Sequence, residues 1–301
     1  MTDFLVTGAG GALGSVLMRE LLRLARPSSG VVSPHGPVPF SGQIWSADLA
    51  DPRTFRERLL AGAPKVIVHL AAIADPMVAY SDPEYARKLN VESTTVLLAC
   101  AEKLGARFLF ASTDLVFDGE AAPYGEDAAP EPLSIYGRTK LEAECHVLTY
   151  RRGVVLRFPL MYGLPEVARK PTFFETLLDR LRAGQSVPLF TDEVRTPLWL
   201  DDAARACVRV ADSELRGVVH VGGPERLSRY EMGERIAAAI GAPPSLLQRS
   251  SRRDLAGPEL RAHDVSLDSS RYRALFTEGP GRAMHEALPV LLAQKPNRLL
   301  S

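Results

Sequence analysis

The chain has 301 residues, with 36 basic and 36 acidic side chains and no net charge at neutral pH. This length allows one large domain or two closely packed ones, and the balanced charge gives no support for binding to nucleic acid or to a membrane surface. Three scattered cysteines exclude a disulfide framework. With no apolar stretch of membrane-span length and no signal-peptide pattern, we expect a cytoplasmic protein.

The N-terminal residues combine an apolar strand, a glycine-rich turn and an amphipathic helix. The strand is expected at residues 4–7 and the helix includes residues 15–22, with Gly8, Gly11 and Gly14 between them. Such glycines permit unusual backbone angles, close approach of a pyrophosphate and tight helix–strand packing, while the helix N-terminus faces the phosphates. We interpret this segment as a dinucleotide-binding turn.

Strands and helices alternate through the first half of the chain. In chain order the expected elements are a short second strand within the proline- and glycine-rich loop 27–42, a strand at 66–72, a helix at 84–104, a strand at 107–111, a helix at 134–150 and a strand at 154–158. The continuous apolar run at 66–72 is typical of a strand buried in a parallel sheet. This order predicts an α/β fold with a doubly wound parallel Rossmann sheet.

The alternation weakens beyond residue 159. Helical periodicity appears at 172–182, 201–210 and 228–240, and a short strand at 218–221 is expected to return to the main sheet. We predict a dinucleotide-binding domain over residues 1–162, rejoined by 201–223, and a smaller substrate-binding lobe formed mostly from residues 163–301. This lobe is expected to close over the strand ends, where open sheets bind ligands.

Tyr136 and Lys140 stand four residues apart in the expected helix 134–150, so they share one face of it. A free tyrosine has a pKa of roughly 10 and is a poor acid–base catalyst at neutral pH. A neighbouring ammonium group favours the phenolate and lowers that pKa. Thr113, just after the strand 107–111, is placed to hold a substrate oxygen in line with the phenol. We predict that these three residues form a catalytic set.

Further motifs spread over most of the chain. They are the glycine turn 8–14, Ala47-Asp48-Leu49, His69-Leu70-Ala71-Ala72, Asp82-Pro83-Glu84 with Leu89-Asn90-Val91, the Ser-Thr-Asp-x-Val-Phe-Asp-Gly pattern at 112–119, Tyr-Gly-x-x-Lys at 136–140, residues 157–163 and Asp201-Asp202-Ala203-Ala204. Together they resemble the extended short-chain dehydrogenase/reductase superfamily, and within it the dTDP-4-dehydrorhamnose reductase group of sugar-nucleotide reductases.

This resemblance implies roles for single residues. Tyr136 would protonate the oxygen of a ketone that receives a hydride. Lys140 would be the electrostatic partner of the Tyr136 phenol and would bind the nicotinamide ribose. Thr113 and Asp114 would contact the substrate. The implied cofactor contacts are Gly8, Gly11, Ala12, Leu13, Gly14, Asp48, Leu49, Ala71, Ala72, Asn90, Tyr136, Lys140 and Phe158. Arg195 precedes Asp202 by seven residues, a spacing at which related epimerases place an arginine on the substrate diphosphate.

The end of the second strand indicates which cofactor is preferred. An acidic residue about 20 residues past the glycine turn usually holds the 2′-hydroxyl of NAD, whereas NADP favours a basic residue there. Residues 31–36 read Val-Val-Ser-Pro-His-Gly and contain no carboxylate. We therefore predict a preference for NADP(H), and use of NAD(H) as well is compatible with the sequence.

Three functions remain open from the sequence. The first is reduction of a keto group on a nucleotide sugar, and the second is another nucleotide-sugar reaction, a dehydration or an epimerisation. Leu115 stands where similar dehydratases carry an acidic residue, and the missing carboxylate at 31–36 disfavours an epimerase. The third is an NAD(P)-binding regulatory subunit like that of methionine adenosyltransferase. Residues 218–240 and 264–268 resemble that regulatory subunit.

No metal site is expected, because the consecutive helical positions Glu144, Cys145 and His146 point in different directions and cannot converge on one ion. His69 is expected to be a packed residue at a strand end. The expected partner is a small molecule, with nucleic acid and membranes excluded, and a homodimer is compatible with the sequence.

Overall fold

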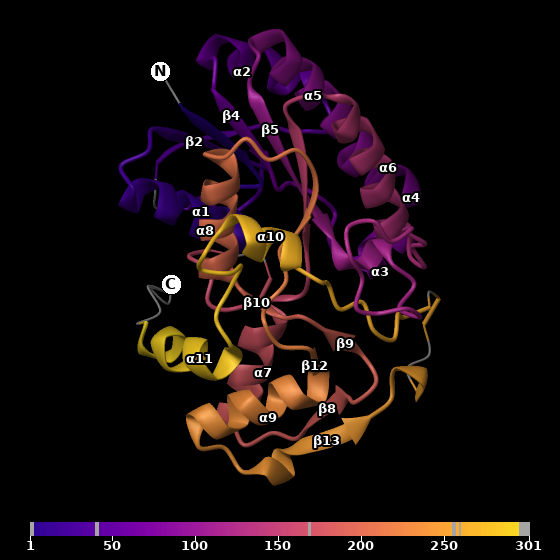
Figure 1. Cartoon of the computed structure of the whole chain (residues 1–301). Coiled ribbons are helices and arrows are strands. Elements are labelled where there is room, and N and C mark those ends of the chain that lie inside the picture. Colours follow the sequence, from indigo (N-terminus) through magenta and orange to yellow (C-terminus); the bar gives the residue numbers. More distant parts are fainter. Residues whose placement is uncertain (1–2, 40–41, 168–169, 255–256, 259, 295–301) are drawn as a thin grey trace.

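Seven parallel strands form the central sheet of the protein, whose computed structural model describes residues 3–39, 42–167, 170–254, 257–258 and 260–294 (Figure 1). The strand order is β11-β6-β5-β4-β1-β2-β3. These strands are β1 (Phe4–Thr7), β2 (Ser28–Val32), β3 (Gln43–Ser46), β4 (Val66–His69), β5 (Arg107–Thr113), β6 (Gly153–Phe158) and β11 (Gly217–His220). The order reverses between β1 and β4, as in a doubly wound Rossmann sheet, which confirms the predicted fold class.

Two groups of helices cover the two faces of this sheet (Figure 1). On one face α1 (Ala12–Arg23) packs against α8 (Leu200–Ala211), and on the other α2 (Arg56–Gly62), α5 (Ser93–Leu104) and α6 (Ile135–Thr149) lie side by side. The remaining helices near this sheet are α3 (Pro76–Ser81), α4 (Pro83–Arg87), η1 (Pro52–Thr54), η3 (Asp114–Val116) and α10 (Ser270–Leu275).

Three local predictions differ from the structure. The helix expected over 84–104 contains a π-helical turn, η2 (Lys88–Glu92), which periodicity alone does not reveal. The strand expected over 66–72 ends at His69. The strand β3 was not predicted, because this edge strand buries only Trp45 and its pattern is too short to recognise.

The second group of elements lies at the carboxyl ends of the central strands (Figure 1). It contains α7 (Phe173–Arg182), β8 (Val187–Phe190), β9 (Val194–Arg195), β12 (Leu227–Ser228), α9 (Arg229–Ile240), η4 (Pro244–Leu246), β13 (Leu247–Ser250), η5 (Arg252–Asp254) and α11 (Met284–Ala293). β8 pairs with β13, β9 pairs with β12, and β7 (Met161–Tyr162) pairs with β10 (Leu198–Trp199) below the sheet. The apolar core of this second group of elements is continuous with the core under α1 and α8.

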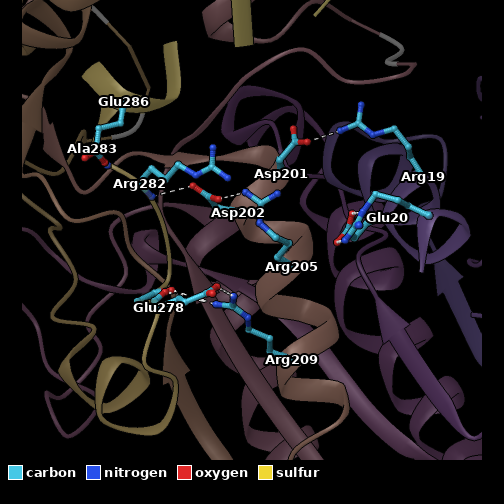
Figure 2. Close-up of polar contacts among 12 residues, drawn as sticks. Arg19, Glu20, Asp201, Asp202, Arg205, Arg209, Glu278, Arg282, Ala283 and Glu286 are labelled. Atoms are coloured by element: carbon cyan, nitrogen blue, oxygen red, sulfur yellow. Dashed lines mark hydrogen bonds and ion pairs between the residues drawn. The ribbon is translucent and has the colours of Figure 1, made fainter. Parts of the chain in front are cut away.

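Helix α8 connects the central sheet to the C-terminal segment through charged contacts (Figure 2). Asp201 forms an ion pair with Arg19 of α1 at 2.6 Å. Asp202 accepts a hydrogen bond of 2.9 Å from the backbone N–H of Arg282, while Arg209 pairs with Glu278. The Asp-Asp-Ala-Ala motif therefore fixes two other segments on one helix. Among the described residues, no helix combines the length and apolar character that a membrane span needs.

Candidate functional site

A crevice of about 510 Å³ opens at the carboxyl ends of β1 and β4, where the strand order reverses. Open α/β sheets bind ligands at such a switch point. The lining residues are Gly8, Gly10, Gly11, Val31, Val32, Ser33, Pro34, His35, Gly36, Pro37, Ala47, Asp48, Leu49, Leu70, Ala71, Ala72, Ile73, Tyr85 and Leu89. Six of the residues predicted to contact a cofactor are among them.

Close backbone packing gives the glycine turn its shape. Gly8 has a φ of +70°, and a Cβ atom there would lie 2.7 Å from the backbone nitrogen of Ala71. A Cβ atom on Gly14 would lie 2.1 Å from the carbonyl oxygen of Gly8. Ala12, Leu13 and Gly14 begin helix α1 and do not line the crevice. Two of the three glycines therefore have a packing role as well as their predicted binding role.

Residues that follow β2 form one wall of the crevice. Between Val31 and Pro37 this wall contains no carboxylate. In the whole lining set, Asp48 is the one acidic side chain. The Asp48 carboxylate accepts a hydrogen bond of 2.9 Å from the backbone N–H of Ala50. Sequence reasoning missed Ile73, Tyr85 and Leu89 as lining residues, although they lie beside or within recognised motifs.

Helix α6 brings Tyr136 to the end of β5. The Ser134 side chain caps the helix by accepting a hydrogen bond of 3.0 Å from Gly137 N–H. A Cβ atom at Gly137 would lie 2.3 Å from the carbonyl oxygen of Leu115, so only glycine allows α6 to approach η3 this closely. The second position of Tyr-Gly-x-x-Lys therefore has a steric explanation.

The Tyr136 phenol is buried at this junction and packs in one apolar cluster with Ala79, Ala86 and Ile73. Burial raises the pKa of the phenol, a hydrogen bond with Thr113 opposes this rise, and the charge of Asp114 adds to it. The lowering of this pKa that we expected from Lys140 is therefore not found. The balance keeps the phenol protonated at neutral pH, which is the form a proton donor needs.

Lys140 lies one turn further along α6 and is also buried. Its Nζ atom is 3.9 Å from the centre of the Phe110 ring. Burial lowers the pKa of this lysine to about 7, and the carboxylate of Glu144 opposes the shift. The ammonium group is thus held within the protein rather than in water.

Asn90 connects the crevice to helix α6. Its side-chain oxygen accepts a hydrogen bond of 2.8 Å from Ile73 N–H, and its Nδ2 donates to Thr139 Oγ1 at 2.9 Å. Asn90 lies within the π-helical turn η2, a distortion that is frequent at functional sites. The residue therefore positions the neighbour of Lys140 relative to the crevice wall, while its predicted cofactor contact stays a prediction.

Glu144 of α6 and Arg157 of β6 form a buried ion pair, with Arg157 Nη2 2.7 Å from Glu144 Oε2. The Ser112 hydroxyl also donates to Glu144. Phe158 is buried beside Thr113, its register partner on the neighbouring strand. These contacts fix α6 to β5 and β6 at the end that carries Thr113.

A second charged group lies next to Thr113. Burial raises the pKa of Asp114 to about 6, and the Arg195 guanidinium, with Nε 3.3 Å from Asp114 Oδ2, opposes this rise. Arg195 also approaches Glu193 at 3.6 Å. Its predicted contact with a diphosphate stays a prediction, but the structure brings it beside the Ser-Thr-Asp motif.

Glu193 is fully buried and holds two further arginines, Arg229 at 2.9 Å and Arg261 at 2.6 Å. Burial by itself would raise the pKa of this carboxyl group, but Arg229, Arg195 and Arg261 together hold the pKa at about 2. Sequence reasoning missed Glu193 because its partners come from β9, α9 and the segment after η5.

His69 is a packed residue, as expected. Its ring nitrogens are hydrogen-bonded to the hydroxyls of Thr7 at 2.6 Å and Thr94 at 2.9 Å. Cys145 and His146 are exposed, while Glu144 points to Arg157. Among the described residues, no group of three or more histidine, cysteine, aspartate or glutamate side chains has a metal-binding arrangement.

Comparison with known proteins agrees with this geometry. Residues 1–295 match the family model described as the RmlD substrate binding domain. Methionine adenosyltransferase 2 subunit beta of Danio rerio is 34% identical over 279 residues, which cover 90% of this chain and 84% of the relative. The probable low-salt glycan biosynthesis reductase Agl14 of Haloferax volcanii is 31% identical, with 88% and 89% of the two chains covered.

Solved structures show the same fold. A hypothetical dTDP-4-dehydrorhamnose reductase from Sulfolobus tokodaii superposes with a TM-score of 0.82 at 27% identity, covering 92% of this chain and 95% of the other. MoeE5 in complex with UDP-glucuronic acid and NAD gives a TM-score of 0.80 at 26% identity, with 95% and 96% covered. The family match spans nearly the whole chain, so the protein belongs to the RmlD substrate binding domain family.

Proposed function

We propose that this protein is an NAD(P)H-dependent reductase that acts on a keto group of a nucleotide-activated sugar. The observation that carries the proposal is the placement of Tyr136, buried near Thr113 and one helical turn before Lys140. Ile73 packs in the cluster of Tyr136 and also lines the crevice. The proposed proton donor is therefore adjacent to the proposed cofactor site.

The crevice has the features that a dinucleotide needs. Gly8 and Gly11 leave backbone exposed to a pyrophosphate at the start of α1, and Asp48 and Leu49 border the position proposed for the adenine. We propose that residues 1–162 with 201–223 bind the cofactor and that residues 163–301 supply most of the substrate lobe. When bound, the nicotinamide supplies the hydride.

The residues of this chain perform the remaining steps. Thr113 orients the substrate carbonyl oxygen through its hydroxyl. Tyr136, kept protonated by burial, donates its proton to that oxygen as negative charge develops there. The buried side chain of Lys140 binds the ribose.

Support for a nucleotide-sugar substrate comes from two sources. Asp114 and Arg195 lie next to Thr113, where a polar substrate would meet both a carboxyl group and a guanidinium. Relatives include a dTDP-4-dehydrorhamnose reductase and a protein bound to UDP-glucuronic acid. We also propose a preference for NADP(H), because the wall from Val31 to Pro37 carries no carboxylate to repel a 2′-phosphate.

A second candidate function rests on the relative from Danio rerio, a methionine adenosyltransferase subunit at 34% identity. The chain would then bind NAD(P) and act as a regulatory subunit for a partner enzyme. The catalytic set does not separate the two functions, because a regulatory subunit can retain it.

Kinetics with the isolated chain separate them. We expect oxidation of NADPH that depends on a 4-keto nucleotide sugar and that falls about 10²-fold or more in Tyr136→Phe, with cofactor affinity nearly unchanged. Lys140→Met should lose affinity as well, and Thr113→Val should lower kcat. Normal turnover by Tyr136→Phe contradicts the proton-donor role. No turnover of any keto sugar, together with co-purification of a catalytic partner, supports the regulatory function instead.

A further inference from the structure

A small cavity at the opposite end of the central sheet gathers four arginines. Its volume is about 250 Å³, and its lining residues are Arg107, Arg151, Arg152, Glu214 and Arg216. A water molecule occupies about 30 Å³ of liquid volume, so the cavity has room for a group several times that size. It lies at the amino ends of β5, β6 and β11, whereas Thr113 lies at the carboxyl end of β5.

The topology of the sheet brings these residues together. Arg107 begins β5, Arg151 and Arg152 form the turn before β6, and Glu214 and Arg216 precede β11. These three strands are neighbours in the sheet and run parallel. Backbone contacts fix the loops, since Phe108 N–H donates to the Arg152 carbonyl at 3.1 Å.

Arg107 is the one buried residue among those that line the cavity. Its side chain is only 6% exposed. Its Nη2 donates to the carbonyl of Leu215 at 2.7 Å, and its buried Nε has no hydrogen-bond partner among the described residues. A buried donor without a partner is unfavourable, because it loses its hydrogen bonds to water.

The positive charge of the residues that line this cavity is not neutralised by ion pairs with other described residues. No ion pair joins any of the five lining side chains to another described residue, whereas Arg19, Arg157 and Arg209 each have a carboxylate partner. Burial lowers the pKa of Arg107. The Glu214 carboxylate opposes this shift, and the positive charges of Arg152 and Arg216 add to it. Four guanidinium groups thus face one carboxylate in a chain whose net charge is zero.

We propose that this cavity binds a phosphate-bearing small molecule at a site separate from the nucleotide crevice. Guanidinium groups match the geometry of phosphate oxygens and form charge-assisted, bidentate hydrogen bonds with them. A phosphate dianion would supply negative charge to arginines that form no ion pair with another described residue. The volume fits a phosphate or diphosphate group, with the rest of the molecule in solvent.

The test is calorimetric titration of the full chain with inorganic pyrophosphate and, separately, with inorganic phosphate. Arg152→Gln/Arg216→Gln removes two exposed charges from the cavity, and Arg182→Gln/Arg253→Gln removes two exposed charges elsewhere as the matched control. We expect binding by the natural chain and the control, and at least about 10-fold weaker binding by the cavity variant, since hydrogen bonds to charged groups are among the stronger ones. Arg107→Lys should weaken binding too, with folding checked by circular dichroism.

Three results would overturn the proposal. Equal pyrophosphate affinity in the cavity variant and the control would show that the arginines do not bind it. Loss of binding in Gly11→Val would place the pyrophosphate in the nucleotide crevice, where this variant acts. Binding of a short single-stranded RNA that depends on Arg152 and Arg216, without binding of pyrophosphate, would assign the cavity to a macromolecular polyanion.

Discussion

The crevice at the carboxyl ends of β1 and β4 and the charged cluster beyond Thr113 differ in how they are formed. The crevice is lined mostly by glycine backbone and small or apolar side chains, together with His35 and Tyr85, and Asp48 is its one acidic lining residue. The cluster joins Asp114, Arg195 and Glu193 in a buried network. The crevice is lined by several short segments between residues 8 and 89, whereas the cluster joins segments as far apart as Asp114 and Arg261 before its charges are paired.

This difference predicts where substitution changes stability and where it changes binding. A substitution on the surface of a site lined by backbone should leave the stability of the fold nearly unchanged. The added side chain takes up space in the site, so ligand affinity should fall. Buried charges resist the loss of a single partner, because the remaining charge is then unpaired in a medium that solvates it poorly.

The largest effect is expected from Glu193→Gln. This change leaves Arg195, Arg229 and Arg261 without their shared, fully buried carboxylate, and breaking a buried pair costs about 3–5 kcal/mol. Urea denaturation measures the free energy of unfolding. Asp212→Asn is the control, because its pair with Arg26 is partly exposed and should contribute about 1 kcal/mol or less. Equal losses in the two variants would contradict the contrast drawn here.

Gly11→Val should have the next largest effect, on binding rather than on stability. Gly11 is exposed and has an ordinary φ of −87°, and its Cβ position would have one near neighbour, at 3.2 Å. The isopropyl group would occupy the crevice and lower NADPH affinity by about 100-fold, or roughly 2.7 kcal/mol. Calorimetry gives the affinity, and thermal unfolding should change little. Gly125→Val, at a position with open space around it, is the matched control.

The sequence was sufficient to predict the strands β1, β4 and β5, because their signals are local: continuous apolar runs and a glycine turn. It also placed Tyr136 and Lys140 one turn apart on one helix, as their spacing predicts, while their catalytic role stays a prediction. It did not reveal Glu193, whose arginine partners lie 2, 36 and 68 residues away along the chain. The raised pKa of Tyr136 was missed for a related reason, because burial depends on the packing of α3 and α4.

A smaller effect should follow from Ser33→Asp in the crevice wall. A carboxylate at this position would repel the 2′-phosphate of NADP and accept from the 2′-hydroxyl of NAD. We expect the ratio of NADPH to NADH affinity to fall by about 10-fold, or roughly 1.4 kcal/mol. Ser33→Asn adds similar bulk without charge and should leave the ratio nearly unchanged. A fall of equal size in both variants would assign the effect to bulk rather than to charge.

The smallest effects concern pH, and here the two regions should differ in sign. His69, behind the crevice, has its pKa lowered from 6.5 to about 3 by burial and by the charge of Lys140. Between these values the unfolded chain binds a proton that the folded chain does not, so this group makes stability rise with pH. Asp114 in the cluster has its pKa raised from 3.8 to about 6 by burial. Over that range the folded chain keeps a proton that the unfolded chain has lost, so stability falls as pH rises.

One titrating proton changes the unfolding free energy by at most about 1.4 kcal/mol per pH unit. From about pH 4 to pH 6, His69→Gln should therefore lower the slope of stability against pH, and Asp114→Asn should increase it. Urea denaturation at several pH values gives both slopes, and their sign is independent of the constant loss that each substitution also causes. Slopes that change in the same direction would mean that one of the two groups does not titrate as its surroundings in the structure require.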